Sequence, residues 1–420
     1  MLLQHSTKKE LKNMAELNLH RGQKPIICLV GNRNAGKSSL INALVGEDVA
    51  ITSKTKGTTT DPVSKSYELK STGPVVFYDT AGLDDDTELG QKRISATEKV
   101  IARSDLILYI VGKEGLDNNG SWLLRNYQMQ DLNFIPVFNF ADIAELSIPD
   151  SLTKRLYDGV SVSAKTGLGI EELKQKIANK LAGDAPEKSL ISDLICPKSS
   201  VVLVSKIDKS APKTNLIMPQ AQVLREVLNK PCPAIITQPE QLKEIIKLQK
   251  IPPQMVISDS QVINEVAEIV PQDIPLTTFS LLFARNKGNF TQMLNGVRML
   301  KDLKNNSKIL IVEGCSHHIS CDDIGRVKIP NLLKKYTQKE LEFDFCVGHD
   351  FPEDLTPYSL VIHCGGCVLR RREIMYRLDM CEKQRVPVTN YGMVIACTQG
   401  VLERTAEPLI NQEPDLPDPR

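Results

Sequence analysis

Residues 31–38 read Gly31-Asn32-Arg33-Asn34-Ala35-Gly36-Lys37-Ser38 and fit the pattern G-x-x-x-x-G-K-[ST] at every fixed position. The apolar run PIICLV before this stretch predicts a buried strand, and the run SLINALV after it predicts the first turns of a helix. A glycine-rich loop between a strand and a helix lets backbone N–H groups wrap a phosphate at the positive helix end. The stretch therefore predicts a P-loop, in which Lys37 reaches the β- and γ-phosphates and the Ser38 hydroxyl holds Mg²⁺.

The length and composition of the chain limit its class. With 420 residues it is too long for one core, so we expect two or three domains. The net charge of +1 gives no basic field that would indicate a nucleic-acid partner. No apolar run is long enough to span a membrane, and the first 23 residues lack the apolar core of a signal peptide, which predicts a cytoplasmic protein without a membrane partner. Ten cysteines are many for a reducing compartment, and they favour metal binding for some of them.

Strand-like and helix-like stretches alternate from residue 25 to 183, which is typical of a mostly parallel sheet with flanking helices. Four short motifs follow the P-loop at the ends of these stretches. They are Gly57-Thr58-Thr59-Thr60-Asp61, Asp79-Thr80-Ala81-Gly82, Asn139-Phe140-Ala141-Asp142 and Ser163-Ala164-Lys165. In P-loop enzymes an aspartate at a strand end, here Asp79, holds Mg²⁺ through water, and a glycine amide beside it senses the γ-phosphate.

In this order, the five motifs resemble the nucleotide-binding motifs of translation-factor-type GTPases. The resemblance implies that Asp142 accepts hydrogen bonds from guanine, which adenine cannot supply, and that the backbone of residues 163–165 contacts guanine O6. It also implies a catalytic set of Lys37, Thr59, Asp79 and Gly82, with Thr58 or Thr59 gripping Mg²⁺ and the γ-phosphate. The full set expected to bind GTP or GDP is Gly31, Asn32, Asn34, Ala35, Gly36, Lys37, Ser38, Ser39, Thr58, Thr59, Asp79, Gly82, Asn139, Asp142, Ser163, Ala164 and Lys165.

Three positions determine how far the resemblance extends to chemistry. Phe140 stands where the family pattern N-K-x-D has lysine, and we expect its ring to stack on guanine in place of the lysine stem. Leu83 follows D-T-A-G where a glutamine would position water, which predicts slow, switch-like turnover. Asn34 matches the asparagine that coordinates K⁺ in potassium-dependent relatives such as the tRNA-modifying GTPase MnmE, where the cation offsets transition-state charge. The alternative for Asn34 is a plain polar loop residue.

Composition along the chain divides it into three α/β domains. Residues 184–195 are polar, contain a proline and predict a linker. We expect a P-loop GTPase domain with an N-terminal leader at residues 1–183, a small α/β domain at 184–275 and a further α/β domain at 276–420. The middle domain is near the lower size limit for independent stability, so we expect it to pair with a copy of itself.

Two expected strands in the last domain each end in a group of soft metal ligands. The strand at 309–312 leads to Cys315 and His317, and the strand at 360–362 leads to His363, Cys364 and Cys367. The carboxyl ends of parallel strands meet at one sheet edge, so we expect these groups to converge. The residues alone leave zinc, an iron–sulfur cluster and simple burial open. We expect the cysteines without partners at ligand spacing to be small buried residues: Cys196, Cys232, Cys321, Cys346, Cys381 and Cys397.

The pattern C-x-H followed by H-C-x-x-C, here Cys315-Ser316-His317 and 363–367, resembles the iron–sulfur signature of the HydF family of [FeFe]-hydrogenase maturation GTPases. The resemblance implies that residues 184–275 form a dimerisation domain and residues 276–420 a cluster-binding domain. It implies a [4Fe–4S] cluster held by Cys315, Cys364 and Cys367, with an exchangeable fourth position for which His363 or His317 is a candidate. It implies a homodimeric scaffold that receives a diiron precursor made with two radical-SAM maturases and hands it to the [FeFe]-hydrogenase apo-enzyme. The alternatives are an RNA- or ribosome-associated GTPase with a zinc-binding C-terminal domain, and a nucleotide-dependent redox sensor without a transfer role.

Overall fold

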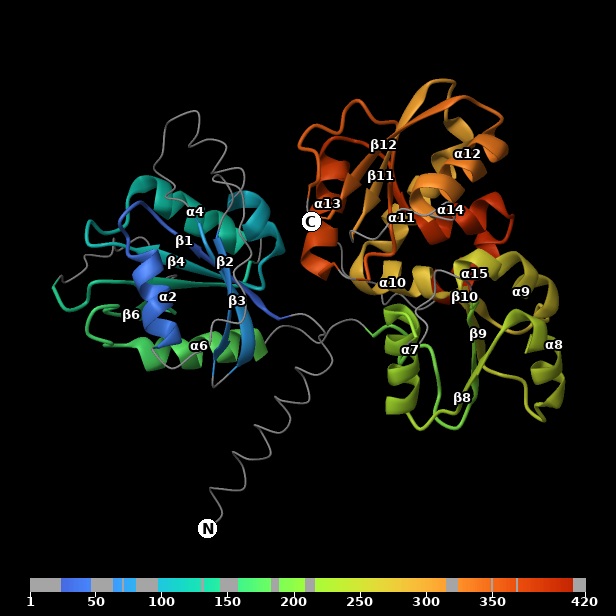
Figure 1. Ribbon diagram of the computed structural model, residues 1–420, viewed down its shortest axis with the longest axis horizontal. Coiled ribbons are helices and arrows are strands. Elements are labelled where there is room, and N and C mark those ends of the chain that lie inside the picture. The colour runs from blue at the N-terminus through green and yellow to red at the C-terminus, as the bar shows by residue number, and fades with distance from the viewer. Residues whose placement is uncertain are drawn as a thin grey trace, which may run out of the picture. The chain divides into compact units, whose positions relative to one another are not determined.

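The computed structural model describes residues 24–46, 63–69, 72–80, 97–129, 132–143, 158–182, 189–207, 216–314, 324–348, 350–367 and 369–410. It divides into two compact units, Met1–Pro186 and Glu187–Arg420, which are drawn in Figure 1 and treated one at a time below. Both units are α/β, as the sequence predicts.

The first unit is built on a six-stranded sheet with the strand order β2-β3-β1-β4-β5-β6. The strands are β1 (Ile26–Val30), β2 (Val63–Leu69), β3 (Gly73–Asp79), β4 (Leu106–Val111), β5 (Phe134–Phe138) and β6 (Val160–Ser161). All neighbours are parallel except β2, which runs antiparallel to β3 at the edge. The carboxyl ends of five strands therefore lie along one edge of the sheet, where α/β proteins bind ligands.

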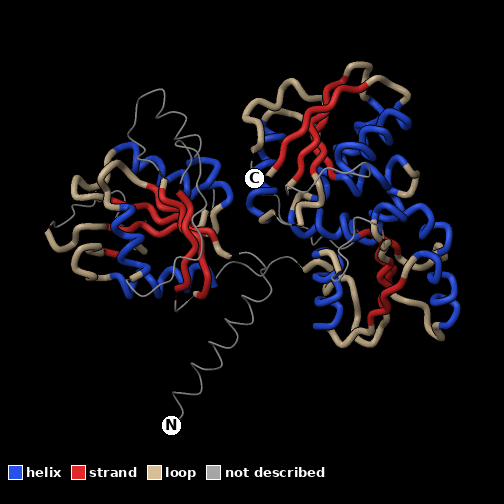
Figure 2. Tube along the Cα trace, viewed as in Figure 1, coloured by secondary structure: helices blue, strands red, loops and turns tan. Residues whose placement is uncertain are grey.

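Alternation along β1 explains why helices cover both faces of this sheet (Figure 2). Ile27 and Leu29 join one core with residues of α2 (Lys37–Val45) and α6 (Ile170–Ala182). The intervening Cys28 and Val30 join a second core with residues of α4 (Asn118–Met129). Because successive strand side chains point to opposite faces, an all-apolar strand needs a helical layer on each side.

The second unit contains two four-stranded parallel sheets. Their strand orders are β10-β9-β7-β8 and β12-β11-β13-β14. The strands are β7 (Val201–Val204), β8 (Ala234–Thr237), β9 (Met255–Ser258), β10 (Leu276–Thr278), β11 (Ser307–Glu313), β12 (Leu341–Val347), β13 (Leu360–His363) and β14 (Val388–Asn390). The helices are α7 (Met218–Asn229), α8 (Pro239–Leu248), α9 (Ile263–Ile269), α10 (Phe279–Lys287), α11 (Phe290–Arg298), α12 (Ile329–Thr337), α13 (Arg371–Lys383), α14 (Tyr391–Thr398) and α15 (Leu402–Ile410).

One continuous core joins the two sheets of this second unit. Buried side chains from Leu190 to Leu409 belong to a single apolar cluster. The helix α10 begins directly after β10 and contacts α7 on one side and α13 and α14 on the other. Arg404 of α15 adds a polar connection, donating to the backbone carbonyls of Ala267, Val270 and Pro271. The regions predicted as separate second and third domains thus pack as one body.

Candidate functional site

The P-loop lies at the carboxyl end of β1, between the predicted strand and the predicted helix. Gly36 has φ 89° and Asn34 has φ 61°, which are left-handed conformations. A Cβ atom on Gly36 would come within 2.2 Å of the Asn139 side-chain nitrogen, so only glycine fits there. Lys37 is buried and donates from Nζ to the carbonyl oxygens of Gly31 and Asn32 at 2.9 Å each. The lysine thus braces the loop whose amides would surround a phosphate.

An oxygen pair suited to a hard cation lies beside the loop. The register of β1 and β3 sets Leu29 opposite Asp79, which brings the end of β3 next to the start of α2. The Ser38 hydroxyl donates to Asp79 Oδ2 at 2.5 Å, and the Thr80 hydroxyl donates to the Leu29 carbonyl at 2.6 Å. A hydroxyl and a carboxylate at this distance are the ligand types that Mg²⁺ uses at phosphate sites, so the residues fit the ion.

Asn139 connects the P-loop to the loop after β6. Its buried side chain donates from Nδ2 to the Ala35 carbonyl at 3.0 Å, and its Oδ1 accepts from the Ala164 N–H at 3.2 Å. Phe140 has φ 69°, and its ring lies near the position that a side chain on Gly36 would occupy. The predicted motifs at 139–142 and 163–165 are therefore joined to the P-loop by hydrogen bonds.

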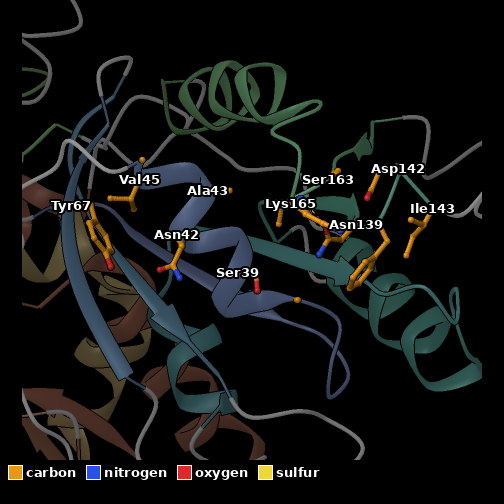
Figure 3. A pocket seen from close by; sticks show the side chains of 14 residues that line it. Ser39, Asn42, Ala43, Val45, Tyr67, Asn139, Asp142, Ile143, Ser163 and Lys165 are labelled. Carbon is orange, nitrogen blue, oxygen red and sulfur yellow. Dashed lines mark hydrogen bonds between the residues drawn. The ribbon is translucent and has the colours of Figure 1, made fainter.

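A cavity of about 930 Å³ opens between these segments (Figure 3). Its wall includes Gly36, Asn139, Phe140 and Asp142 together with Ser39, Asn42, Ala43, Val45, Gly46, Tyr67, Ile143, Ser163, Ala164 and Lys165. In Figure 3, Tyr67 lies at one end of the cavity and Asp142 at the other, with Ser39 between them. Asp142 is exposed, so its carboxylate is open to a ligand. The size and the mixed lining suit a nucleotide.

Several predicted site residues lie outside the described residues. They are Thr58, Thr59, Gly82, Cys315 and His317, and their roles stay predictions. The K⁺ role predicted for Asn34 also stays a prediction; its side chain is exposed.

The second candidate site is the loop at residues 364–369, which follows β13; Val368 lies outside the described residues, and the site is built from residues 364–367 and 369. The strands β11 and β13 are parallel neighbours with Val312 opposite His363, so their ends meet as predicted. Cys364 Sγ accepts N–H groups from Gly314 at 3.0 Å and from Gly366 at 3.4 Å. Gly314 is the residue that precedes Cys315 in the sequence. Burial raises the pKa of the Cys364 thiol, and the two N–H groups act in the opposite direction.

Amide donors aimed at one sulfur suit a thiolate that is bound to a metal or cluster. Cys367 is half-buried on the same loop. Among the residues that the structure describes, no group of three or more metal-ligating side chains is assembled. Cys364 and Cys367 lie on one loop at the end of β13, and the third predicted cysteine, Cys315, lies outside the described residues.

His363 is fully enclosed at the end of β13. Its Nδ1 lies 3.0 Å from the Cys364 carbonyl, and Arg377 Nη1 lies 3.0 Å from Nε2. Since a carbonyl accepts and a guanidinium donates, the ring is neutral with its proton on Nδ1. Burial and then the Arg377 charge lower the pKa of His363 to about 4. Both ring nitrogens are engaged, so His363 would have to leave these partners to become the fourth ligand.

Arg377 and Lys287 are two residues near this loop to which sequence reasoning gave no role. Arg377 donates to the Glu373 carboxylate at 2.5 Å and to the Gly348 carbonyl at 2.6 Å while almost completely buried. The helix α13 begins at Arg371, directly after Arg370, which is in an extended conformation. A signal for Arg377 was available, since Glu373 precedes it by four residues on the same helix.

The remaining cysteines divide by exposure. Cys232, Cys346 and Cys381 are buried, which confirms that prediction, whereas Cys397 is only partly buried. The prediction for Cys196 is wrong: its side chain is exposed because the residue lies in the loop before β7 rather than in an element. Cys321 lies outside the described residues. Within the part of the chain that is described, no helix is long and apolar enough to cross a bilayer.

Family models match three consecutive regions of the chain. One described as the 50S ribosome-binding GTPase matches residues 26–140. The hydrogen maturase F dimerization domain matches residues 190–288, and the hydrogen maturase F tetramerization domain matches residues 291–408. The chain thus carries a GTPase domain followed by two domains of types named for oligomer formation.

Individual relatives resemble part of the chain. The tRNA modification GTPase MnmE of Dichelobacter nodosus is 36% identical over 164 residues, which are 37% of this chain and 34% of that protein. The GTPase Der of Pseudothermotoga lettingae is 30% identical over 192 residues, 44% of this chain and 43% of that protein. The chain therefore spans less than half the length of these curated relatives. The solved G domain of the T. maritima FeoB iron transporter matches at 25% identity and a TM-score of 0.30, covering 38% of this chain and 99% of that domain.

Proposed function

This chain belongs to the hydrogen maturase F (HydF) family, and from that premise we propose that it is a GTP-hydrolysing scaffold for the maturation of [FeFe]-hydrogenase. In this role it holds a [4Fe–4S] cluster with one exchangeable position and delivers a diiron precursor, its cargo, to the apo-hydrogenase. The single observation that carries the proposal is the loop at 364–369, where two backbone amides point at Cys364 Sγ beside the end of β11.

The nucleotide part of the proposal rests on the P-loop and the cavity. Lys37, Ser38 and Asp79 would serve the phosphates and Mg²⁺, and Asp142 would select guanine. We expect slow turnover because Leu83 stands where a water-positioning glutamine would be. We also expect stimulation by K⁺ through Asn34.

The cluster part rests on Cys364 and Cys367, with Cys315 as the proposed third ligand. A [4Fe–4S] cluster with three thiolate ligands supplies an iron with an open coordination position, which a donor or acceptor molecule can approach. The two amides at Cys364 would stabilise negative charge on its sulfur. His363 and His317 remain candidates for the fourth position, and the engagement of His363 with Arg377 favours a replaceable role for it.

The proposal also covers partners and location. The dimerization and tetramerization domains support self-association, and we propose the dimer as the basic form. The hydrogenase and two radical-SAM maturases are proposed as partners on the basis of the family. Eight cysteines in the described segments are free thiols, which suits the reducing cytoplasm.

Anaerobic reconstitution with ferrous iron and sulfide tests this function. We expect about four irons per chain and the electron paramagnetic resonance signal of a reduced [4Fe–4S] cluster. Cys364→Ser should lose the cluster, His363→Ala should keep it, and the exposed Cys196→Ser serves as the matched control. A Cys364→Ser variant that retains full iron, or a wild-type chain that binds none, would refute the proposal.

A second candidate, an RNA-associated GTPase with a zinc site, is favoured by the description of the GTPase family model and by the tRNA-modifying relatives. The net charge of +1 weighs against it. Zinc in place of iron after anaerobic purification, together with salt-dependent RNA binding, would favour this second candidate.

A further inference from the structure

The last residue of α10, Lys287, reaches across to the loop at 364–369. Its Nζ donates to the carbonyl oxygens of Gly366 at 3.0 Å, Cys367 at 2.9 Å and Leu369 at 2.9 Å. An ammonium group has three protons, so three converging carbonyls match its donor capacity. These residues lie about 80 positions apart in sequence, and the contact is therefore a product of the tertiary fold.

The loop needs such support because its backbone is unusual. Gly366 has φ 62°, and a Cβ atom there would come within 2.5 Å of the Ile374 side chain. The Gly366 carbonyl also accepts the Leu369 N–H at 3.1 Å, and the Gly366 N–H is one of the two that face Cys364 Sγ. Holding the Gly366 carbonyl therefore restrains the residue whose N–H faces Cys364 Sγ.

The helix that carries Lys287, α10, is held in place by hydrogen bonds and an ion pair. The Thr278 hydroxyl caps the start of α10 by accepting the Leu281 N–H at 3.2 Å. Near the other end, Arg285 is buried and forms a two-point ion pair with Asp193. Arg371 Nε donates to the Asn286 carbonyl at 3.3 Å, which adds a second connection to the start of α13. A side chain fixed in this way can hold a loop without moving itself.

We propose that Lys287 is a positioning residue for the proposed cluster: it holds the loop at 364–369 in its ligand-presenting shape before a cluster arrives. Its second effect is electrostatic, because a cation fixed at the carbonyl of Cys367 offsets part of the negative charge of a thiolate-bound cluster. This inference rests on the proposed function for its electrostatic part only; the support of the loop concerns the protein without metal.

Hydrogen–deuterium exchange on the metal-free chain tests the support directly. We expect Lys287→Met to accelerate exchange within 364–369 roughly tenfold, because the carbonyl clamp is lost while the side-chain length is kept. Lys287→Arg should restore most of the protection. Lys335 on α12 is exposed, so Lys335→Met is the matched control, and its loop amides should exchange at the wild-type rate. Unchanged exchange in Lys287→Met, or equal acceleration throughout 216–410, would overturn the proposal.

Anaerobic reconstitution provides the second readout. In Lys287→Met the cluster should show a more negative midpoint potential in a titration followed by electron paramagnetic resonance, since removal of a nearby cation disfavours the added electron. An unchanged potential would overturn the electrostatic part. A wild-type chain that takes up no iron would overturn the proposed function, while the exchange experiment would still decide whether Lys287 holds the loop.

Discussion

Removing the Arg377 guanidinium should destabilise the second unit and leave the first unit intact. Arg377 is 2% exposed and donates to Glu373, which is 5% exposed, as well as to the Gly348 carbonyl and His363. Its guanidinium also lies 5.4 Å from the centre of the Phe351 ring. Arg377→Met keeps much of the side-chain volume but removes the guanidinium donors from the buried Glu373 carboxylate and from the Gly348 carbonyl.

The expected loss in the free energy of unfolding is about 3–5 kcal/mol, the usual cost of removing one partner from a buried ion pair. The double variant Arg377→Met/Glu373→Leu removes the buried carboxylate as well, so it should recover all but about 1–2 kcal/mol. Lys334→Met disrupts the exposed pair with Glu340 and should cost less than about 1 kcal/mol.

The sole tryptophan makes the assay selective. Trp122 belongs to α4 of the first unit and is 59% exposed. Its fluorescence in urea therefore reports the GTPase domain, whereas far-ultraviolet circular dichroism reports both units. We expect Arg377→Met to lower the midpoint of the dichroism transition without moving the fluorescence transition. A loss below about 1 kcal/mol, or a double variant no more stable than the single one, would refute the reasoning.

Three further predictions concern other residues. Asn139→Ala removes the hydrogen bonds to Ala35 and Ala164 and should weaken GTP binding roughly tenfold in calorimetry, at about 1.5 kcal/mol; unchanged affinity would contradict the linking role. Phe140→Ala should weaken GDP binding about threefold to tenfold if the ring stacks on the base, and an improvement would refute stacking. Although partial burial acts in the opposite sense, the hydrogen bonds and charge of Arg285 lower the pKa of Asp193. The pair therefore stabilises the fold above the ordinary aspartate pKa and loses this effect as the pH falls through the lowered pKa, so Asp193→Asn should melt lower than wild type at pH 7, and the difference should be smaller at about pH 3. An equal gap at both pH values would argue against the ion pair.

Local signals in the sequence correctly predicted which residues lie at the sheet edge beside the P-loop. Gly31, Asp79 and Asn139 lie at the carboxyl ends of β1, β3 and β5. Parallel strands share their carboxyl ends, so these residues meet at one sheet edge, and no knowledge of the helix packing is needed to predict it. The same rule correctly predicted that β11 and β13 would end together. The antiparallel edge strand β2 was missed, since residues 63–69 mix polar and apolar residues without a long buried run.

Features that depend on distant packing were not predictable. The spacing of Glu373 and Arg377 indicates a pair on one helix face, but only the fold shows that this pair is buried and that Lys287 reaches a loop about 80 residues away. The shared core of the second unit escaped prediction for a similar reason. The sequence predicts a domain boundary near residue 276. It does not show that α10, which follows this boundary, packs against helices of both sheets.

The single core formed by buried side chains from Leu190 to Leu409 limits how the second unit can change shape. Bending between its two sheets would require α10 to separate from α7 or from α13, which would expose apolar side chains to water. Displacement of the whole unit and rearrangement of surface segments cost less free energy, because they leave the apolar core buried. A change of shape in this unit should therefore be confined to its surface segments, and crosslinks engineered between α10 and α7 or α13 should leave its fold unchanged.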